Sequence, residues 1–335
     1  MQDSVAVKVF VTHNVEDLDA YYGRALPELQ SIAEVTVNPL DRDLSGPELI
    51  DAAAGCDVIV AHRATGADAA VFESLPNLMA FLRCAVDIST IDVEAASSFG
   101  VLVARADKSF VASTAELALG LLLATSRHIA TSTADYRSGV APAQHPGQQL
   151  RGLTAGIIGY GAIGSYLAEL LSAVGLDVLV ADPFVDAVRT PASLVDLAEL
   201  LSDADVVFPL AQATPATENM IGVAELAAMK PAATLINVSR GELLDEEAVR
   251  DALDAGSLRA VGMDVGRAAD QRPSPVLAAH PRVVATPHLG GLTPQNADAQ
   301  AASSVEQVRS MIAGSMPPRT VNAADARRLR EYWSQ

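Results

Sequence analysis

The amino-acid sequence predicts an α/β protein with two parallel-sheet domains. Short β-rich runs alternate with segments of helical periodicity over residues 5–103, and a second series of this kind begins at Thr154. A loop rich in Gly, Pro and Gln, residues 139–152, lies between the two series. The length of 335 residues suits two cores, because a single core stops growing at about 250 to 300 residues.

The first series predicts strands and helices in alternation. Strands are expected at 5–12, 34–37, 57–61, 78–84 and 101–104, and helices at 16–33, 46–55 and 92–100. One long helix should follow from about Ser113 to Tyr136, because leucines recur there at helical spacing.

The second series repeats this pattern. Strands are expected at 155–159, 176–182, 205–210, 232–239, 258–265 and 282–286. A helix from Ile163 should end at Gly175, and Ser193 with Asp196 is a variant capping box for another helix. A final helix is expected from about Gly291, and the short tail after it should pack on the first domain.

Composition excludes several function classes. The net charge of −18 makes the surface acidic, which disfavours nucleic acid and anionic membranes as partners. Cys56 and Cys84 are too few for a disulfide framework and lack zinc-type spacing, so no metal site is predicted and a reducing cytoplasm is expected. We expect no export signal or membrane anchor.

A glycine-rich turn carries the clearest binding signal. Gly159, Gly161 and Gly164 follow a predicted strand and open a predicted helix, and Ala162 and Ile163 lie between them. In a Rossmann-like fold such glycines allow a tight turn, a close approach of backbone to pyrophosphate and close helix packing. The five residues are therefore predicted to bind a dinucleotide.

Asp182 strengthens this interpretation. It ends the next predicted strand 18 residues after Gly164, near the offset of about 20 at which a carboxylate bonds the ribose 2′-hydroxyl. That carboxylate would repel a 2′-phosphate, so NAD is preferred to NADP. Arg189 is the one nearby cation that could favour NADP.

Several motifs resemble one family over nearly the whole chain. "INVSRGELLDEEAVRDAL", "AVGMDV" and "VVATPHLGG" are similar to the D-isomer-specific 2-hydroxyacid dehydrogenases, as are "STIDVEAASSFGVLV", "STAELALGLLLATSR" and the tail motif "PPRTVN". The resemblance implies a Rossmann-like NAD-binding domain, residues 104–290, inserted into a flavodoxin-like substrate (catalytic) domain, residues 1–103 plus 291–335. It also implies a homodimer.

The implied activity is hydride transfer between NAD(H) and a small 2-hydroxy or 2-keto acid, with CH–OH groups as donors. Arg240 matches the family arginine, whose planar fork can hold the carboxylate and carbonyl oxygens of the substrate. His288 matches the family proton donor, and Asp264 resembles the residue that bonds the nicotinamide carboxamide.

The third catalytic group departs from the family pattern. The family places a glutamate five residues after the position of Asp264, where this chain has Ala269. Asp270 is the nearby downstream carboxylate, so a shifted backbone could let it face His288. It could equally point to solvent.

The substrate loop also departs from the family. Ala85 and Asp87 occupy two places at which the family has glycine, with Val86 between them, and Arg105 replaces an asparagine. An acidic Asp87 would repel a substrate carboxylate unless Arg83, Arg105 or Lys108 offsets it or binds a second acidic group. Alternatively, Asp87 turns outward and these cations are solvated.

Two other functions remain open at this point. One is an NAD(H)-sensing binding protein or scaffold of the same fold, which the displaced acid and the altered loop leave possible. The other is a dehydrogenase of the formate or phosphite type. The presence of both Arg240 and His288 favours the 2-hydroxy acid reaction.

Overall fold

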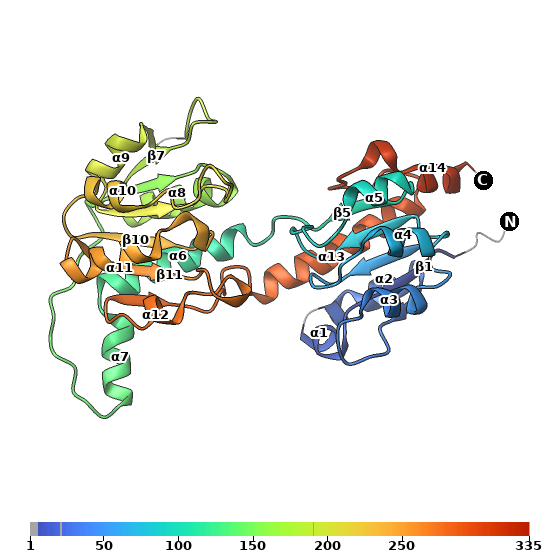
Figure 1. The fold of residues 1–335 in the computed structure, drawn as a ribbon, viewed down its shortest axis with the longest axis horizontal. Helices are drawn as coiled ribbons and strands as arrows, with labels where there is room; N and C mark the ends of the chain where they lie inside the picture. The colour runs from blue at the N-terminus through green and yellow to red at the C-terminus, as the bar shows by residue number, and fades with distance from the viewer. Residues whose placement is uncertain (1–5, 21, 190, 335) are drawn as a thin grey trace. The chain divides into compact units, whose positions relative to one another are not determined.

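The computed structural model describes residues 6–20, 22–189 and 191–334. The chain forms two compact units (Figure 1): unit 1 comprises Met1–Ser109 with Pro294–Gln335, and unit 2 comprises Phe110–Thr293. The predicted fold class is confirmed, because each unit is built on a parallel sheet. The units divide at 109/110 and 293/294, where the sequence suggested 103/104 and 290/291.

Unit 1 contains a five-stranded parallel sheet of order β2-β1-β3-β4-β5. Its strands are β1 Lys8–Val11, β2 Glu34–Val37, β3 Val58–Ala61, β4 Ala80–Arg83 and β5 Leu102–Arg105. Its helices are α1 Val15–Ala20, η1 Tyr22–Arg24, α2 Leu26–Gln30, α3 Gly46–Ala52, α4 Ala69–Ser74, α5 Val93–Ser98, α13 Pro294–Ile312, η4 Ala323–Asp325 and α14 Arg327–Trp333.

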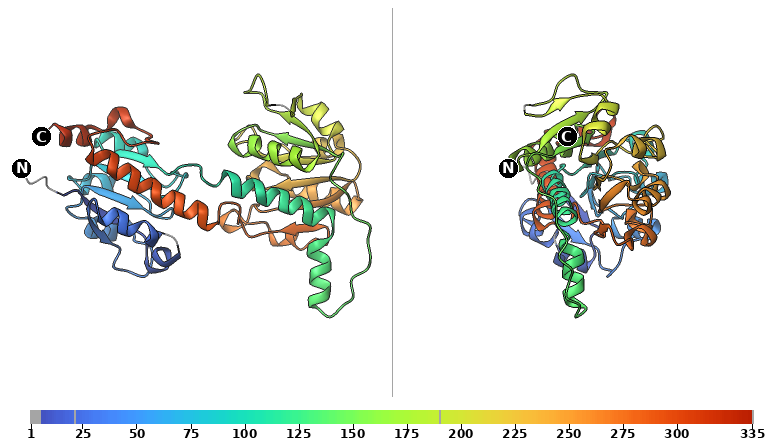
Figure 2. Two further views of the ribbon diagram at one scale, coloured as in Figure 1. Left: turned by 180° about the vertical axis from the view of Figure 1, so that it is seen from behind. Right: turned by 90° about the vertical axis from the view of Figure 1, so that its left-hand side faces the viewer.

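Strands β3, β4 and β5 and most of β1 are buried on both faces of the sheet, whereas the edge strand β2 is largely exposed. Successive side chains of a strand point to opposite faces, so each of these strands contributes to two cores. Val9 and Val11 enter one core, which α13 and α14 help to cover, whereas Phe10 enters the other with α3, α4 and α5. Helix α13 therefore returns the chain to the first core, as the left view of Figure 2 shows.

The tail of the chain packs on unit 1, as the sequence predicted. Leu329 of α14 is fully buried. Arg328 Nη1 donates to the carbonyls of Leu75 and Leu78, and the indole of Trp333 donates to the carbonyl of Met311 at 2.8 Å. These contacts fix the C-terminal helix against the sheet that the N-terminal segment forms.

Two predictions for unit 1 need correction. The helix expected at 16–33 is three shorter pieces, α1, η1 and α2, and within η1 the backbone of Gly23 packs against the Leu18 carbonyl. A Cβ at Gly23 would lie 2.4 Å from that oxygen. Helix α4 was not predicted, and the predicted start of the first strand at Val5 lies outside the described residues.

Unit 2 contains a seven-stranded parallel sheet of order β12-β11-β10-β9-β6-β7-β8. Its strands are β6 Thr154–Ile158, β7 Asp177–Ala181, β8 Ser193–Leu194, β9 Val206–Pro209, β10 Ala233–Asn237, β11 Leu258–Met263 and β12 Val283–Ala285. Its helices are α6 Val111–Ser126, α7 Ile129–Arg137, α8 Ala162–Val174, α9 Leu197–Asp203, α10 Val223–Ala228, η2 Gly241–Leu243, α11 Glu246–Ala255, η3 Ala269–Gln271 and α12 Pro275–Ala278.

Helices cover both faces of this sheet. Helices α6 and α8 pack on one face through residues such as Leu121 and Leu167, and α9, α10 and α11 cover the other through residues such as Leu200 and Leu253. The inner strands β6, β9, β10 and β11 are accordingly apolar on both faces, which is typical of parallel sheets, whereas the edge strand β8 is exposed.

Two helix predictions for unit 2 were wrong in their boundaries. The helix expected from Ser113 to Tyr136 breaks into α6 and α7 at His128, whose φ of 54° is left-handed. Ser193 belongs to the short strand β8, and Asp196 caps α9 by accepting from the Glu199 amide at 2.8 Å. No helix among the described residues is long and apolar enough to cross a membrane.

Candidate active site

The candidate site of unit 2 lies at the carboxyl ends of its strands. Because all strands are parallel, the residues that follow β6, β7, β10, β11 and β12 meet at one edge of the sheet. The chain runs outward from β6 through β7 to β8 and then continues on the other side of β6 with β9. Ligands of open α/β sheets bind outside the carboxyl ends at such a switch point.

Three glycines shape the turn between β6 and α8. Gly159 has a φ of 104°, and a Cβ there would lie 2.8 Å from the backbone of Ala211 and Leu210. A Cβ at Gly164 would lie 2.2 Å from the Gly159 carbonyl oxygen, so this helix packs on the turn without a side chain between. A Cβ at Gly161 would meet nothing within 4 Å.

This turn fits the pyrophosphate of a dinucleotide. The space beside Gly161 is open at the N-terminus of α8, a helix of 13 residues that begins with Ala162 and Ile163. The amides of such a terminus lack helical partners and carry partial positive charge, which suits phosphate oxygens. Because Gly161 has no side chain, its backbone is open to a ligand.

Asp182 lies immediately after β7 and is tied to the same turn. Its Oδ2 accepts from the Tyr160 amide at 2.7 Å, and its Oδ1 accepts from the Phe184 amide at 2.9 Å. The carboxylate is therefore fixed beside the glycine turn. Arg189 is the cation that could have favoured a 2′-phosphate, and its Nη1 lies 3.3 Å from Glu169 Oε1.

Asp264, which follows β11, is fully buried and organises the segment after β12. Its Oδ1 accepts from Thr286 Oγ1 at 2.6 Å and from the Leu289 amide at 2.7 Å, and its Oδ2 accepts from the Gly290 amide at 2.8 Å. Its main-chain oxygen accepts from the His288 amide at 2.9 Å. The carboxylate thus holds the histidine segment from inside.

His288 is half-buried and has a left-handed backbone with φ 62°. Its Nδ1 lies 2.9 Å from the main-chain oxygen of Asp270. A carbonyl oxygen can only accept, so Nδ1 carries a proton and Nε2 is the ring atom that can exchange a proton with a ligand.

Asp270 reaches His288 through its backbone and turns its carboxylate elsewhere. Its Oδ2 lies 3.7 Å from Arg272 Nη2, and the two side chains are 65% and 58% exposed. Its φ of 58° is also left-handed. The structure brings the two predicted residues together, with a carbonyl in the place where the sequence suggested a carboxylate.

Arg240 follows β10 and its side chain is exposed. Asn237 Nδ2 donates to its carbonyl at 2.8 Å, and its own Nη1 donates to the Ser239 carbonyl at 2.8 Å. The next residue, Gly241, packs directly on the Gly266 backbone, where a Cβ would lie 2.2 Å from a carbonyl carbon. Arg240 follows β10 and His288 follows β12, and these two strands flank β11.

The predicted substrate loop of unit 1 follows β4. Ala85 and Val86 are half-buried and Asp87 is exposed. The Ala106 amide donates to the Ala85 carbonyl at 3.0 Å, and Asp87 Oδ1 accepts from the Ser89 amide at 2.9 Å. The loop is therefore joined to the end of the neighbouring strand β5.

The three cations considered for this loop lie in different surroundings. Arg105, at the end of β5, is half-buried, and its carbonyl accepts from Gln307 Nε2 at 2.8 Å. Lys108 is exposed. Arg83 is fully buried, and its guanidinium donates to the carbonyls of His62 and Thr65 and to Thr90 Oγ1. Arg83 therefore braces the loop from inside.

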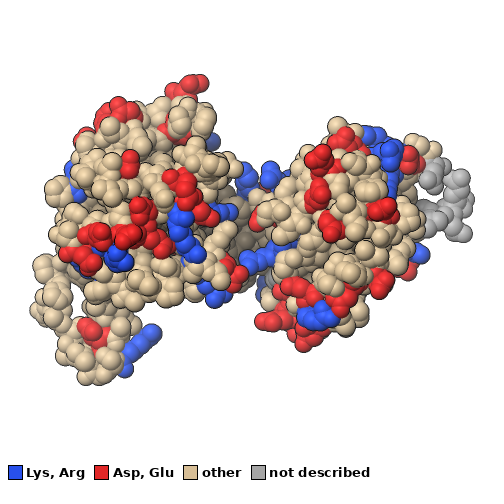
Figure 3. Space-filling model, viewed as in Figure 1, with Lys and Arg blue, Asp and Glu red and all other residues tan. Residues whose placement is uncertain are grey.

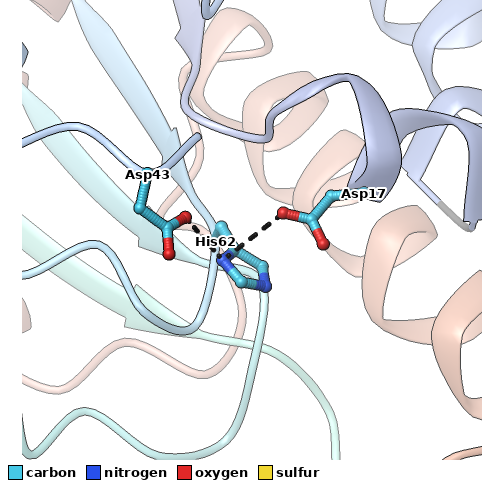
Figure 4. Close-up of side chains that lie close together, drawn as sticks. All are labelled: Asp17, Asp43 and His62. Carbon is cyan, nitrogen blue, oxygen red and sulfur yellow. Dashed lines mark ion pairs between the residues drawn. The ribbon is translucent and has the colours of Figure 1, made fainter. Parts of the chain in front are cut away.

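A histidine cluster in unit 1 was not predicted. His62 Nδ1 lies 3.6 Å from Asp17 Oδ2 and 3.5 Å from Asp43 Oδ1 (Figure 4). His13 stacks on Tyr22 with ring centroids 4.3 Å apart and meets His62 edge-on at 5.3 Å. His13 and His62 follow the adjacent strands β1 and β3, which is the signal that could have paired them.

Burial dominates the protonation of this cluster. It holds the pKa of His13 well below the usual 6.5, and the charges of His62 and Arg83 add to the effect. Burial also lowers the pKa of His62, although the Asp17 and Asp43 carboxylates oppose that shift. Both rings are therefore more weakly basic than exposed imidazoles.

Comparison with known proteins relates this chain to one group of enzymes. Residues 119–290 match the family model described as D-isomer specific 2-hydroxyacid dehydrogenase, NAD binding domain. A D-3-phosphoglycerate dehydrogenase of Mycobacterium leprae is 36% identical over 288 residues, which cover 84% of this chain and 54% of that protein. The chain thus spans about half the length of that relative.

Two further similarities extend over most of both chains. A hydroxypyruvate reductase of Thermotoga maritima is 33% identical, with 83% of this chain and 90% of that protein covered. A solved structure from Thermus thermophilus is 32% identical with a TM-score of 0.82, and the match covers 94% of this chain and 100% of the other.

Proposed function

Because the chain belongs to the D-isomer specific 2-hydroxyacid dehydrogenase family, we propose that it is an NAD-dependent oxidoreductase of small 2-hydroxy and 2-keto acids. Unit 2 contains the family's NAD-binding domain, and NAD is the cofactor. The observation that carries the proposal is the placement of Arg240 and His288 after β10 and β12, on the sheet whose β6–α8 turn suits pyrophosphate.

We assign cofactor binding to the glycine turn and its neighbours. Gly159, Gly161 and Gly164, with Ala162 and Ile163, would receive the pyrophosphate at the start of α8. Asp182 would accept hydrogen bonds from the ribose hydroxyls, and its charge favours NAD over NADP. Asp264 supports the His288 segment and would lie at the nicotinamide end of the site.

Arg240 and His288 would carry the substrate chemistry. When bound, NADH supplies the hydride for the carbonyl carbon of the keto acid. The Arg240 guanidinium would hold the carboxylate and the carbonyl oxygen, and each charged hydrogen bond contributes roughly 1.5 to 3 kcal/mol. His288 Nε2 would give its proton to that oxygen in reduction and accept it back in oxidation.

Unit 1 would be the substrate domain and would recognise the substrate. We assign this role to the loop of Ala85, Val86 and Asp87 and to Arg105. Because Asp87 is acidic and exposed, the loop would disfavour a simple carboxylate unless Arg105 compensates it. If Arg105 instead binds a second acidic group of the substrate, Arg105→Ala should lower activity toward dicarboxylic keto acids more than toward monocarboxylic ones. Equal losses would rule out contact of Arg105 with a second acidic group.

The activity is tested by the loss of NADH absorbance with a panel of 2-keto acids. We expect turnover in the unmodified protein, and a loss of about 10²- to 10⁴-fold in kcat for His288→Gln. His280→Gln is the matched control, because His280 precedes β12 and pairs with Asp254 at 3.4 Å. NADH binding without turnover of any acid would favour the sensing or scaffold function instead.

We also propose that the protein is a homodimer of the cytoplasm. Helix α7 has no buried residue, and Figure 1 shows it projecting from the rest of unit 2. Ile129 and Tyr136 are 52% and 71% exposed, which is apolar surface that a second copy could cover. Sedimentation should give twice the monomer mass, and the double variant Ile129→Glu with Tyr136→Arg should reduce the measured mass.

The proposed cytoplasmic location is supported by the free, buried cysteines, which suit a reducing compartment.

A further inference from the structure

We propose that the main-chain carbonyl of Asp270 is the positioning group for His288, in place of the carboxylate that the family has at the position of Ala269. The inference rests on the proposed function, in which His288 exchanges the proton. It assigns the orientation of the ring to backbone geometry rather than to a charged side chain. Asp270 is thus a positioning residue that acts through His288.

The contact itself fixes the tautomer. His288 Nδ1 lies 2.9 Å from the Asp270 oxygen, a normal hydrogen-bond distance. Because the oxygen has no proton to give, Nδ1 donates in both the neutral and the charged ring. The neutral ring consequently presents an unprotonated Nε2 and the charged ring presents Nε2–H, the two states that proton exchange requires.

Three other carbonyls of the loop around Asp270 accept hydrogen bonds within the loop. The Gly266 amide donates to the Gln271 oxygen at 2.9 Å, and the Ala268 amide donates to the Arg272 oxygen at 3.0 Å. The Arg272 amide donates to the Ala269 oxygen at 3.2 Å. The Asp270 carbonyl is the one in this run that meets the imidazole.

A left-handed backbone produces that arrangement. Asp270 and Gln271 have φ values of 58° and 56°. Gly, Asn and Asp tolerate this conformation best, whereas β-branched residues are strongly disfavoured. The Asp270 carboxylate faces Arg272 in an exposed pair, which is worth little. The conformation that the residue permits therefore explains its role better than its charge does.

Asp264 completes the restraint on His288. The His288 amide donates to the Asp264 carbonyl, and the Asp264 carboxylate holds Leu289 and Gly290. The backbone of the histidine is therefore held by the residue after β11, and only rotation of the ring remains free. The hydrogen bond to the Asp270 carbonyl restrains that rotation.

The test compares substitutions that keep the left-handed turn with one that breaks it. Asp270→Asn and Asp270→Gly should keep kcat within about threefold, because the carbonyl stays in place. Asp270→Val should lower kcat by about 10- to 100-fold, as misplacement of a reacting group does, with the Kd of NADH unchanged. Ala232→Val is the matched control, since Ala232 has a φ of 62° in the same unit and should lose stability without this loss of kcat.

Nitrogen NMR of the imidazoles supplies a readout that does not require activity. The chain has six histidines, and His288→Gln assigns the signal. We expect the Nδ1–H tautomer in the unmodified protein and in Asp270→Asn, and a mixture in Asp270→Val. A predominant Nε2–H tautomer, or a kcat in Asp270→Asn as low as in Asp270→Val, would overturn the proposal. If the tautomer is as expected but no keto acid is reduced, the proposed function fails and the positioning contact stands.

Discussion

Single buried polar groups determine where the candidate catalytic side chains lie. Asp264 is fully buried, and its carboxylate accepts three hydrogen bonds from the segment that carries His288. A buried carboxylate is stable only when it is satisfied in this way. One residue of the segment after β11 thereby sets the position of a histidine 24 positions later in the chain.

Replacement of Asp264 by asparagine should therefore affect both stability and turnover. The amide would put a donor against the Leu289 or Gly290 amide, and an unsatisfied buried donor costs about 1 to 3 kcal/mol. We expect this decrease in the free energy of unfolding in urea, together with a lower kcat. Asp254→Asn is the control, because Asp254 is 65% exposed beside His280. If Asp264→Asn is as stable and active as the unmodified protein, the anchoring role of Asp264 is wrong.

At the scale of the element, the glycine turn separates packing from ligand access. Gly164 has no room for a Cβ, whereas Gly161 has open space and a φ of −74°, which any residue adopts. Gly164 serves the contact between α8 and the turn, and Gly161 leaves room for a ligand. Two glycines of one motif thus have different roles.

Alanine substitutions should distinguish these demands. Gly164→Ala should destabilise the protein by about 1 to 3 kcal/mol, because a Cβ would overlap the Gly159 carbonyl. Gly161→Ala should leave the unfolding free energy within about 0.5 kcal/mol but weaken NADH binding about tenfold, or 1.4 kcal/mol. Titration calorimetry and thermal unfolding measure the two effects. Unchanged NADH affinity in Gly161→Ala would place the pyrophosphate elsewhere.

Elements with a local sequence signal were predictable, and those that depend on tertiary contacts were not. The alternation of apolar runs predicted both parallel sheets, and the motifs placed Arg240 and His288 just beyond the carboxyl ends of strands. The break at His128 was not visible, because its neighbours keep helical spacing. Asp270 has a left-handed backbone in a loop that the hydrogen bond from the Gly266 amide to the Gln271 carbonyl closes, and no local pattern of the sequence indicated that geometry.

At the scale of the whole molecule, the net charge is strongly negative. Unit 1 of this acidic protein contains buried histidines. The chain carries 41 acidic and 23 basic residues, and acidic side chains are spread over the visible surface of each unit in Figure 3. In unit 1, His13 is buried and its pKa is well below 6.5. The unfolded chain therefore binds a proton at mildly acidic pH that the folded protein does not.

Stability of unit 1 should consequently fall as the pH drops below about 6.5. The contribution of His13 is fully present above that pH and is lost below it at up to about 1.4 kcal/mol per pH unit, and His62 acts in the same direction. The single tryptophan, Trp333, lies in unit 1 and reports its unfolding in urea. His13→Gln should flatten the dependence between pH 5 and 7, whereas exposed His128→Gln should not. Equal slopes would contradict this origin.

The most direct measurement of the proposed reaction follows the hydride itself. NADH that carries deuterium at the transferred position of C4 is incubated with the protein and a 2-keto acid that it consumes, and the product is analysed by mass and by chiral separation. We predict a 2-hydroxy acid of D configuration with one deuterium at C2, and no such product from His288→Gln or Arg240→Ala. A product of L configuration, or bound NADH with no deuterium transferred to any acid, would contradict it.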